Sequence, residues 1–170
     1  MRLPLLAAGF GLLLLPAPAA PADVTVHFIS PEQYTDAGGY GADTARNLHA
    51  IGGHLERLTA RCLAAGETLE YRVHDIDLAG RDEWWHRGAY DLRVMRDITW
   101  PRIDLSFVRR DSAGKIVAEG REQVSDMSYL WRSAWVRNDA DALPYEKAML
   151  KEWTEQRFCR DPAPRRARSY

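Results

Sequence analysis

Cysteine is scarce in this sequence, because only Cys62 and Cys159 occur among 170 residues. Structural zinc sites and thiol redox centres need clustered cysteines or a C-x-x-C pair, so the spacing excludes both classes of site. In an oxidising compartment two such thiols commonly form a disulfide. We expect that bridge here, joining the ends of two predicted helices, and two separate buried thiols are the alternative.

Long hydrophobic runs are also scarce. The one apolar stretch, residues 5–15, is well short of the roughly 20 residues that a membrane-spanning helix needs. It follows the positive charge of Arg2 and precedes small residues spaced for cleavage, a pattern typical of an export signal peptide. We therefore expect a signal peptide over residues 1–22, cleaved near Ala22. The mature chain is expected to be periplasmic or secreted, with no transmembrane segment.

An excess of charge of one sign is lacking as well. The chain carries 23 Lys and Arg against 24 Asp and Glu, a formal net charge of −1, which excludes the basic footprint of a nucleic-acid-binding protein. Residues 23–160 suit one domain. Arginines within residues 165–168 follow Pro162 and Pro164, so we expect residues 161–170 to form a flexible basic tail.

The familiar catalytic and cofactor motifs are absent too. The sequence has no G-x-S-x-G turn for a serine nucleophile, no phosphate-binding loop, no dinucleotide fingerprint and no H-E-x-x-H zinc motif. His49 and His54 stand five residues apart on a predicted helix and therefore point to different faces. We predict no catalytic residue set, no metal site and no cofactor, and a non-enzymatic protein is favoured over an enzyme.

Secondary-structure signals are regular along the first half of the chain. Alternating β-branched residues predict a strand over residues 24–29. An apolar stripe over residues 48–62 predicts an amphipathic helix with Asp43 as its N-cap and Gly66 as its C-terminal stop. Gly52 lies inside that helix, and close packing of the helix on a sheet explains a glycine there.

The remaining chain is typical of antiparallel strands followed by a second helix. Residues 68–78 predict a strand with a β-bulge near His74, and residues 92–100 predict another strand. Residues 103–124 predict a hairpin, and Pro144 opens a final helix. The predicted fold class is α+β: a mainly antiparallel sheet of four to five strands with two helices packed on one face.

Carboxylates near strand ends are the strongest candidates for chemistry. Asp75 and Asp77 share a strand face if that segment is extended, and Asp104 is the third member of the candidate cluster. Such carboxylates bind a hard cation or act as an acid–base pair. The alternative is structural: the same side chains cap strand ends or form ion pairs with neighbouring arginines, namely Arg93, Arg96 and Arg102.

Tryptophans are the strongest candidates for binding. Trp84, Trp85 and His86 follow a predicted turn, where exposed indoles would form a platform for a ligand or a partner. The alternative is a lid over one end of the core. Trp131 and Trp135 allow the same two interpretations, and for this pair core packing is favoured.

Several short segments carry a more specific pattern. They are Val24-Thr25-Val26, Tyr34-Thr35-Asp36, Asp75-Ile76-Asp77-Leu78-Ala79-Gly80, Pro101-Arg102-Ile103, Gly120, Asp126-Met127 and Tyr145-Glu146-Lys147. With these segments the chain resembles, over nearly its whole mature length, an exported bacterial family catalogued as domain of unknown function 3016. The resemblance implies a periplasmic or secreted single domain, and it carries no activity, cofactor or catalytic residue.

The sequence favours an exported, non-enzymatic module of the cell envelope that binds an envelope protein or a small ligand. A hydrolase or metal-dependent enzyme using Asp75, Asp77 and Asp104 is the alternative. A third interpretation is an envelope-assembly or transporter accessory subunit that offers a sheet edge to its partner.

Overall fold

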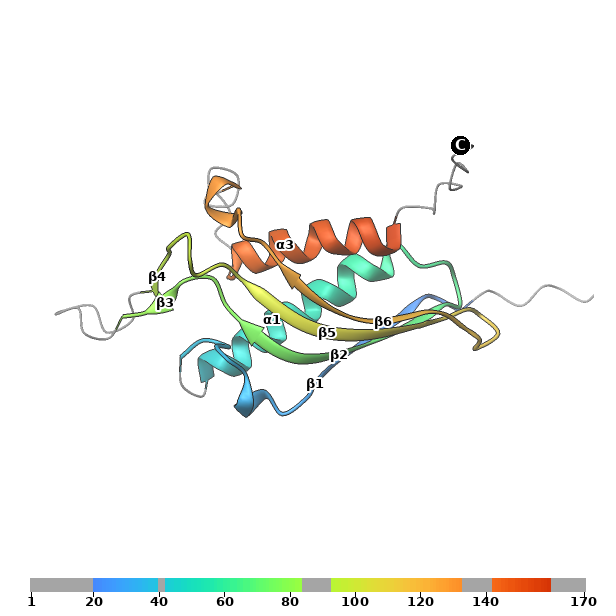
Figure 1. The fold of residues 1–170 in the computed structure, drawn as a ribbon. Helices are drawn as coiled ribbons and strands as arrows, with labels where there is room; N and C mark the ends of the chain where they lie inside the picture. The colour runs from blue at the N-terminus through green and yellow to red at the C-terminus, as the bar shows by residue number, and fades with distance from the viewer. Residues whose placement is uncertain (1–19, 40–41, 84–92, 133–141, 160–170) are drawn as a thin grey trace, which may run out of the picture.

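The computed structural model describes residues 20–39, 42–83, 93–132 and 142–159, and Figure 1 shows their arrangement. The elements in chain order are β1 (Asp23–Phe28), η1 (Pro31–Gln33), α1 (Ala42–Ala60), β2 (Thr68–Asp77), β3 (Arg81–Asp82), β4 (Arg93–Val94), β5 (Arg102–Arg110), β6 (Ile116–Ser125), η2 (Tyr129–Arg132), α3 (Pro144–Thr154) and η3 (Glu155–Cys159).

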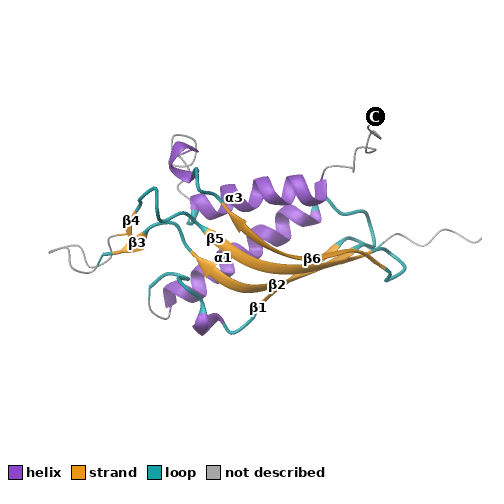
Figure 2. Ribbon diagram, in the orientation of Figure 1, coloured by secondary structure: helices purple, strands orange, loops and turns teal. Residues whose placement is uncertain are grey.

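Four strands form the main sheet in the order β1-β2-β5-β6, and β3 and β4 form a separate two-stranded sheet. β1 pairs with β2 in parallel, because α1 returns the chain to the same end of the sheet. The β2–β5 and β5–β6 pairs are antiparallel. Both helices cover one face of the sheet (Figure 2), so the predicted α+β class is confirmed.

The core lies between the helices and the sheet. Leu55 of α1, Val73 of β2 and Leu150 of α3 are all fully buried. Each such side chain contributes roughly 1.5–3 kcal/mol through loss of contact with water. A β-carbon at Gly52 would touch the ring of Phe28 at 3.4 Å, which confirms that this glycine lies where α1 packs closely on the sheet.

Two local predictions from the sequence are confirmed. The register of β2 against β5 shifts between Val73 and Asp75, which is the predicted bulge. The hairpin from β5 to β6 turns at Gly114, whose φ of +81° suits a residue without a side chain. The bulge matters for the site below, because it reorients the end of β2.

Three other predictions were wrong. The strand expected over residues 92–100 is limited to Arg93–Val94, because the chain then turns, with the Thr99 N–H donating to the carbonyl of Arg96 at 3.0 Å. Asp43 lies inside the first turn of α1 and is not its N-cap. The helix ends at Ala60, and Gly66 with its φ of +82° belongs to the turn before β2.

Cys62 and Cys159 form the predicted disulfide, with their Cα atoms 4.6 Å apart in space and the residues 97 positions apart in the chain. The bridge ties the turn after α1 to the end of η3. Within the part of the chain that the structure describes, no helix combines the length and apolar character needed to cross a bilayer.

Candidate functional site: an arginine–carboxylate network beside an exposed apolar surface

The Asp77 carboxylate at the end of β2 is the centre of a charged cluster. Its side chain is only 4% exposed, and it accepts hydrogen bonds from Arg81, at 2.5 Å, and from Arg102. Burial opposes its ionisation, but the two guanidinium groups outweigh burial and lower the pKa of Asp77 below its ordinary value. The same contact with Asp77 raises the pKa of Arg81.

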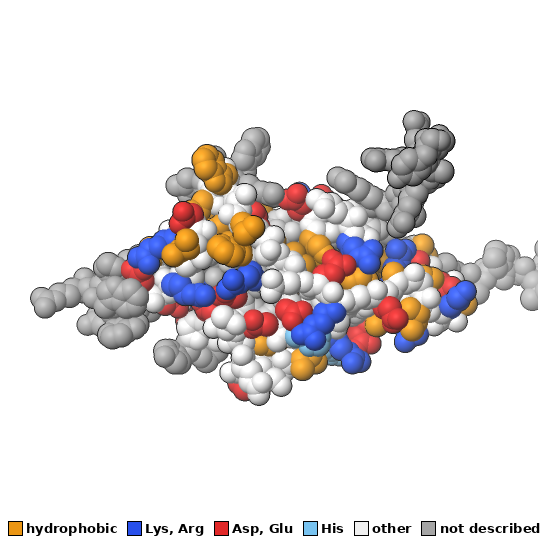
Figure 3. Space-filling model, in the orientation of Figure 1, with side chains coloured by type: hydrophobic (Ala, Val, Ile, Leu, Met, Phe, Trp, Pro, Cys, Tyr) orange, Lys and Arg blue, Asp and Glu red, His pale blue; other side chains and the backbone are white. Residues whose placement is uncertain are grey.

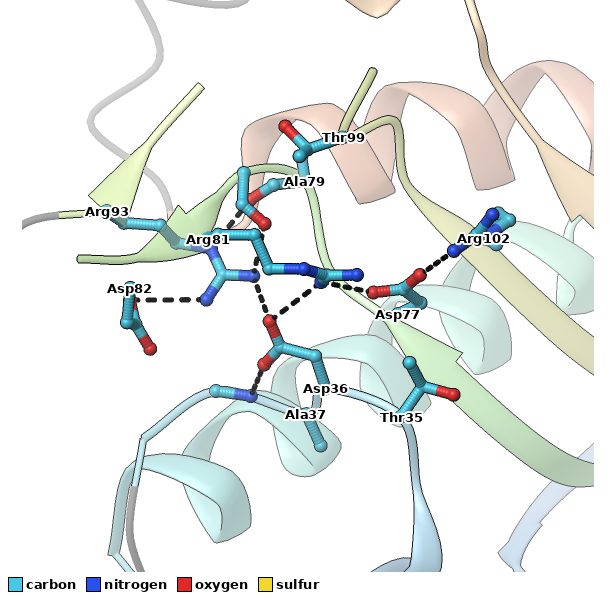
Figure 4. Close-up of polar contacts among 12 residues, drawn as sticks. Thr35, Asp36, Ala37, Asp77, Ala79, Arg81, Asp82, Arg93, Thr99 and Arg102 are labelled. Atoms are coloured by element: carbon cyan, nitrogen blue, oxygen red, sulfur yellow. Dashed lines mark hydrogen bonds and ion pairs between the residues drawn. The ribbon is translucent and has the colours of Figure 1, made fainter. Parts of the chain in front are cut away.

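A second carboxylate, Asp36, reaches the cluster from the loop after η1. Its backbone pairs with β2, since its N–H donates to Ile76 at 2.8 Å and its carbonyl accepts the Leu78 N–H at 3.0 Å. Its Oδ2 atom lies between two guanidinium groups, 2.7 Å from Arg93 and 3.2 Å from Arg81 (Figure 4). We call Asp36, Asp77, Arg81, Arg93 and Arg102 the arginine–carboxylate network.

Arg93 connects the network to the turn between β2 and β3 through hydrogen bonds to backbone carbonyls of that turn. Its Nε donates to the Ala79 carbonyl at 2.6 Å, and another guanidinium nitrogen lies 3.3 Å from the Gly80 carbonyl. Gly80 has a φ of +79°, and a β-carbon there would lie 2.8 Å from the Val94 carbonyl. The turn therefore needs glycine, both for its conformation and for the close approach of β4.

Glu146 holds the same turn from the opposite side. Its side chain lies in the first turn of α3, is nearly fully buried and accepts the N–H of Ala79 at 2.7 Å. Burial raises the pKa of Glu146, since the charged form loses hydration there. The end of β2 is thus held between Arg93 on one side and a buried acid from α3 on the other.

Exposed apolar side chains lie at the same end of the molecule. Trp131 is 91% exposed, Ile98 72% and Met127 67%. In Figure 3 hydrophobic side chains gather around η2 and the loop between β4 and β5, beside arginines. We call Ile98, Met127 and Trp131 the apolar end surface. The interpretation of Trp131 as a core residue was therefore wrong.

Buried Tyr129 holds the two segments of this surface together. Its hydroxyl donates to the Arg96 carbonyl at 2.6 Å, and its ring packs edge-on against Tyr145 with centroids 5.0 Å apart. The Asp126 N–H also donates to the Pro101 carbonyl at 3.3 Å. These contacts keep the loop after β4 beside the segment that follows β6, so the exposed side chains have a rigid base.

A family model described as protein of unknown function (DUF3016) matches residues 22–156. The chain belongs to this family. No curated protein matches the chain. Among solved structures, a dodecamer of a PelC variant from Paraburkholderia phytofirmans is similar at a TM-score of 0.39 and 13% identity, over 86% of this chain and 95% of that one.

Four of the segments on which the sequence resemblance depends come together around the network, and they contain Thr35, Asp75 to Gly80, Arg102 and Glu146. Thr35 donates its N–H and its hydroxyl to Asp75 at 2.7 and 2.8 Å. Glu146 binds Ala79, and Asp77 binds Arg102. Segments far apart in the sequence therefore meet at the end of β2, which makes this region the candidate functional site.

Each of the three predicted carboxylates is held by a different partner. Asp75 and Asp104 lie opposite each other on β2 and β5, but Asp75 binds Thr35 and Asp104 binds Arg121 at 2.7 and 3.1 Å. The hydrogen bonds from Arg121 lower the pKa of Asp104. Among the described residues, no three His, Cys, Asp or Glu side chains are placed to hold a metal ion.

Ser106 has a histidine neighbour that the sequence did not reveal. His74 Nε2 lies 2.9 Å from the Ser106 hydroxyl, within reach of a nucleophile–base pair. In serine hydrolases a carboxylate orients such a pair by accepting a hydrogen bond from the other imidazole nitrogen. Here both oxygens of Asp104 accept from Arg121, so the third member of a triad is engaged elsewhere.

Trp84, Trp85, His86 and Trp135 lie outside the described residues. The sequence pointed to Asp77, Arg93 and Arg102 but gave no role to Asp36 or to Glu146. Their presence in the segments that carry the family resemblance was the available signal.

Proposed function

We propose that this protein is an exported, non-enzymatic binding module of the cell envelope, which docks a partner protein through the apolar end surface. The observation that carries the proposal is the exposure of Trp131, at 91%, together with Ile98 and Met127. Large exposed apolar groups at one place mark interaction surfaces, and tryptophan is enriched where binding energy concentrates.

The state of the carboxylates supports binding over catalysis. Asp77 and Asp104 have lowered pKa values and are held by arginines, so each is ionised and occupied at neutral pH. A general acid needs a pKa near the working pH, and a metal ligand needs accessible oxygens. The network instead acts as a rigid frame behind the binding surface.

Export is the second part of the proposal. The family match begins at residue 22, where the predicted signal peptide ends, and the Cys62–Cys159 disulfide suits an oxidising compartment. We propose residues 1–22 as the signal peptide, 23–160 as the domain and 161–170 as a flexible basic tail. N-terminal sequencing of the protein from fractionated cells tests this part. Recovery from the periplasm with Asp23 first is expected, whereas a cytosolic chain that begins at Met1 contradicts it.

Site-specific photocrosslinking in intact cells tests the docking surface. A photoreactive residue at position 131 is expected to give one discrete adduct, and Met127→Asp in the same chain is expected to abolish it. Lys115, exposed in the hairpin between β5 and β6, provides the matched control position and should give no such adduct. Identical adducts from positions 131 and 115, or none from 131, would contradict the proposal.

A further inference from the structure

The two edge strands of the main sheet, β1 and β6, differ in how well they are protected against pairing with a further strand. The edge strand β6 carries Glu119, Arg121 and Glu122, and Glu122 accepts a hydrogen bond from Trp153 of α3 at 2.8 Å. Charged side chains on an edge strand are a common defence against strand addition. β1 has a regular parallel register of six residues with no bulge and no proline, and among the described residues no strand pairs with its outer side.

The outer side of β1 presents backbone hydrogen-bonding groups. The N–H of Asp23 donates inward to Glu67 at 3.0 Å, and the N–H of Ile29 donates inward to Val73 at 2.9 Å. Because backbone groups alternate along a strand, the N–H and C=O groups of the even-numbered residues face outward. These residues are Val24, Val26 and Phe28.

We propose that β1 pairs antiparallel with β1 of a second copy of this chain, across a twofold axis at Thr25. This register places Thr25 opposite its own symmetry mate, Val24 opposite Val26, and Asp23 opposite His27. Threonine pairs and β-branched pairs favour antiparallel strands, and a carboxylate accepts a hydrogen bond from an imidazole N–H. A twofold interface then repeats each contact twice.

The position of Asp23 selects this register over its neighbours. With the axis at Val26, Asp23 would lie opposite the apolar Ile29. With the axis at His27, two imidazoles would face each other. Only the axis at Thr25 places the acidic side chain of one strand opposite the imidazole of the other. Asp23 and His27 are both exposed on the helix-free face, where they are free to meet.

A groove of mixed character lies at the end of the paired strands. Its lining is apolar at Val26, Phe28, Ile29, Pro31 and Leu48 and polar at His27, Glu70 and Arg72, and Ile29 is 42% exposed. In the proposed register Asp23 of the second copy, opposite His27, lies at the margin of this groove. The association joins the four-stranded sheets of the two copies into one continuous sheet.

Cysteine crosslinking tests the register. Cys62 and Cys159 are joined, so Thr25→Cys introduces the only free thiol. Paired residues in this position have Cα atoms within disulfide range, so mild oxidation of the purified protein is expected to give a covalent dimer. His27→Cys is the matched control, because its symmetry mate lies four strand positions away, roughly 13 Å, and should not crosslink. Equal or stronger crosslinking at position 27, or none at 25, overturns the proposal.

Light scattering on the purified protein provides an independent test. The native chain is expected to have the mass of a dimer, and Val24→Pro is expected to be monomeric. Proline at this position removes an outward N–H and leaves the inward hydrogen bonds to β2 in place. Circular dichroism checks that the variant is folded. A native chain that stays monomeric, or a folded Val24→Pro variant that remains dimeric, overturns the proposal. Neither result bears on the photocrosslinking test of the apolar end surface.

Discussion

Asp77 and Arg102 lie directly opposite each other across β2 and β5, and their side chains form an ion pair between residues 25 positions apart in the chain. Asp77 is the last residue of β2, and Arg102 is the first residue of β5. The pair therefore fixes the ends of both strands where the chain leaves the sheet for β3 and β4. Arg81 binds the same carboxylate from the other side, so one buried acid holds two guanidinium groups.

Asp77→Asn is expected to destabilise the fold. The substitution removes the charge that Arg81 and Arg102 share, and hydrogen bonds to charged groups contribute about 1.5–3 kcal/mol each. Both arginines are partly exposed and regain hydration, so we expect a loss of about 2 kcal/mol in the free energy of unfolding, measured by urea denaturation. Asp104→Asn removes a more exposed pair with Arg121, and we expect a smaller loss. Equal losses for the two variants would contradict this account.

Acid is expected to remove the contribution of Asp77. Its pKa is lowered in the folded state, so this stabilisation is complete above the unfolded value of roughly 3.9 and is lost as the pH falls through the lowered pKa. The difference in unfolding free energy between the native chain and Asp77→Asn should be constant near neutral pH and shrink as the pH falls below the unfolded value. Denaturation series across this range measure it, and a difference that grows in acid would rule out the assigned direction.

Glu146 is expected to show the opposite pH dependence. Its pKa is raised in the folded state, so folding is favoured when the carboxyl is protonated and less favoured as the pH rises through the raised pKa. Glu146→Gln keeps an oxygen for the Ala79 N–H and carries no charge. We expect its stability to match or exceed that of the native chain at neutral pH, whereas Glu146→Ala leaves the N–H without its acceptor and loses about 1–3 kcal/mol. Thermal unfolding in mild acid and at neutral pH distinguishes these cases.

The elements of this fold were predictable where a local pattern decides them. The apolar stripe that contains Ile51 and Leu55 identified α1, and the turn before Gly114 identified the hairpin, because Asp111 accepts hydrogen bonds from nearby N–H groups. Residues 92–100 alternate as a strand does, yet most of the described part of that segment has no partner strand. Pairing depends on the rest of the sheet, which a local pattern does not contain.

The candidate site was less predictable, because its contacts join distant segments. The sequence named arginines as partners for Asp77, and Arg102 is one of them. Asp36 and Arg93 are 57 positions apart, and only the closure of the loop after η1 onto β2 brings them together. The charges of the network were visible in the sequence, whereas the choice of partners required the fold.

Gly80→Ala is expected to destabilise the turn that Arg93 and Glu146 hold. The residue has a φ of +79°, and an added β-carbon would lie 2.8 Å from the Val94 carbonyl. Gly114→Ala is the matched control, since Gly114 has a φ of +81° with open space around it. The left-handed conformation costs each alanine roughly 1–2 kcal/mol, and only Gly80→Ala adds the clash. A larger fall in melting temperature for Gly80→Ala is therefore expected, and equal falls would show that the close approach has no energetic weight.

The Cys62–Cys159 disulfide is expected to make a large contribution to the stability of the fold. Cys62 and Cys159 enclose most of the domain, and loss of a native disulfide from a small domain costs about 2–5 kcal/mol. Cys62→Ser, Cys159→Ser and the double variant should therefore have similar, lowered melting temperatures, because each lacks the same bridge. Reductant should lower the melting temperature of the native chain and leave the double variant unchanged. Mass spectrometry of the non-reduced native protein should show no alkylated thiol, and two alkylated cysteines would contradict the bridge.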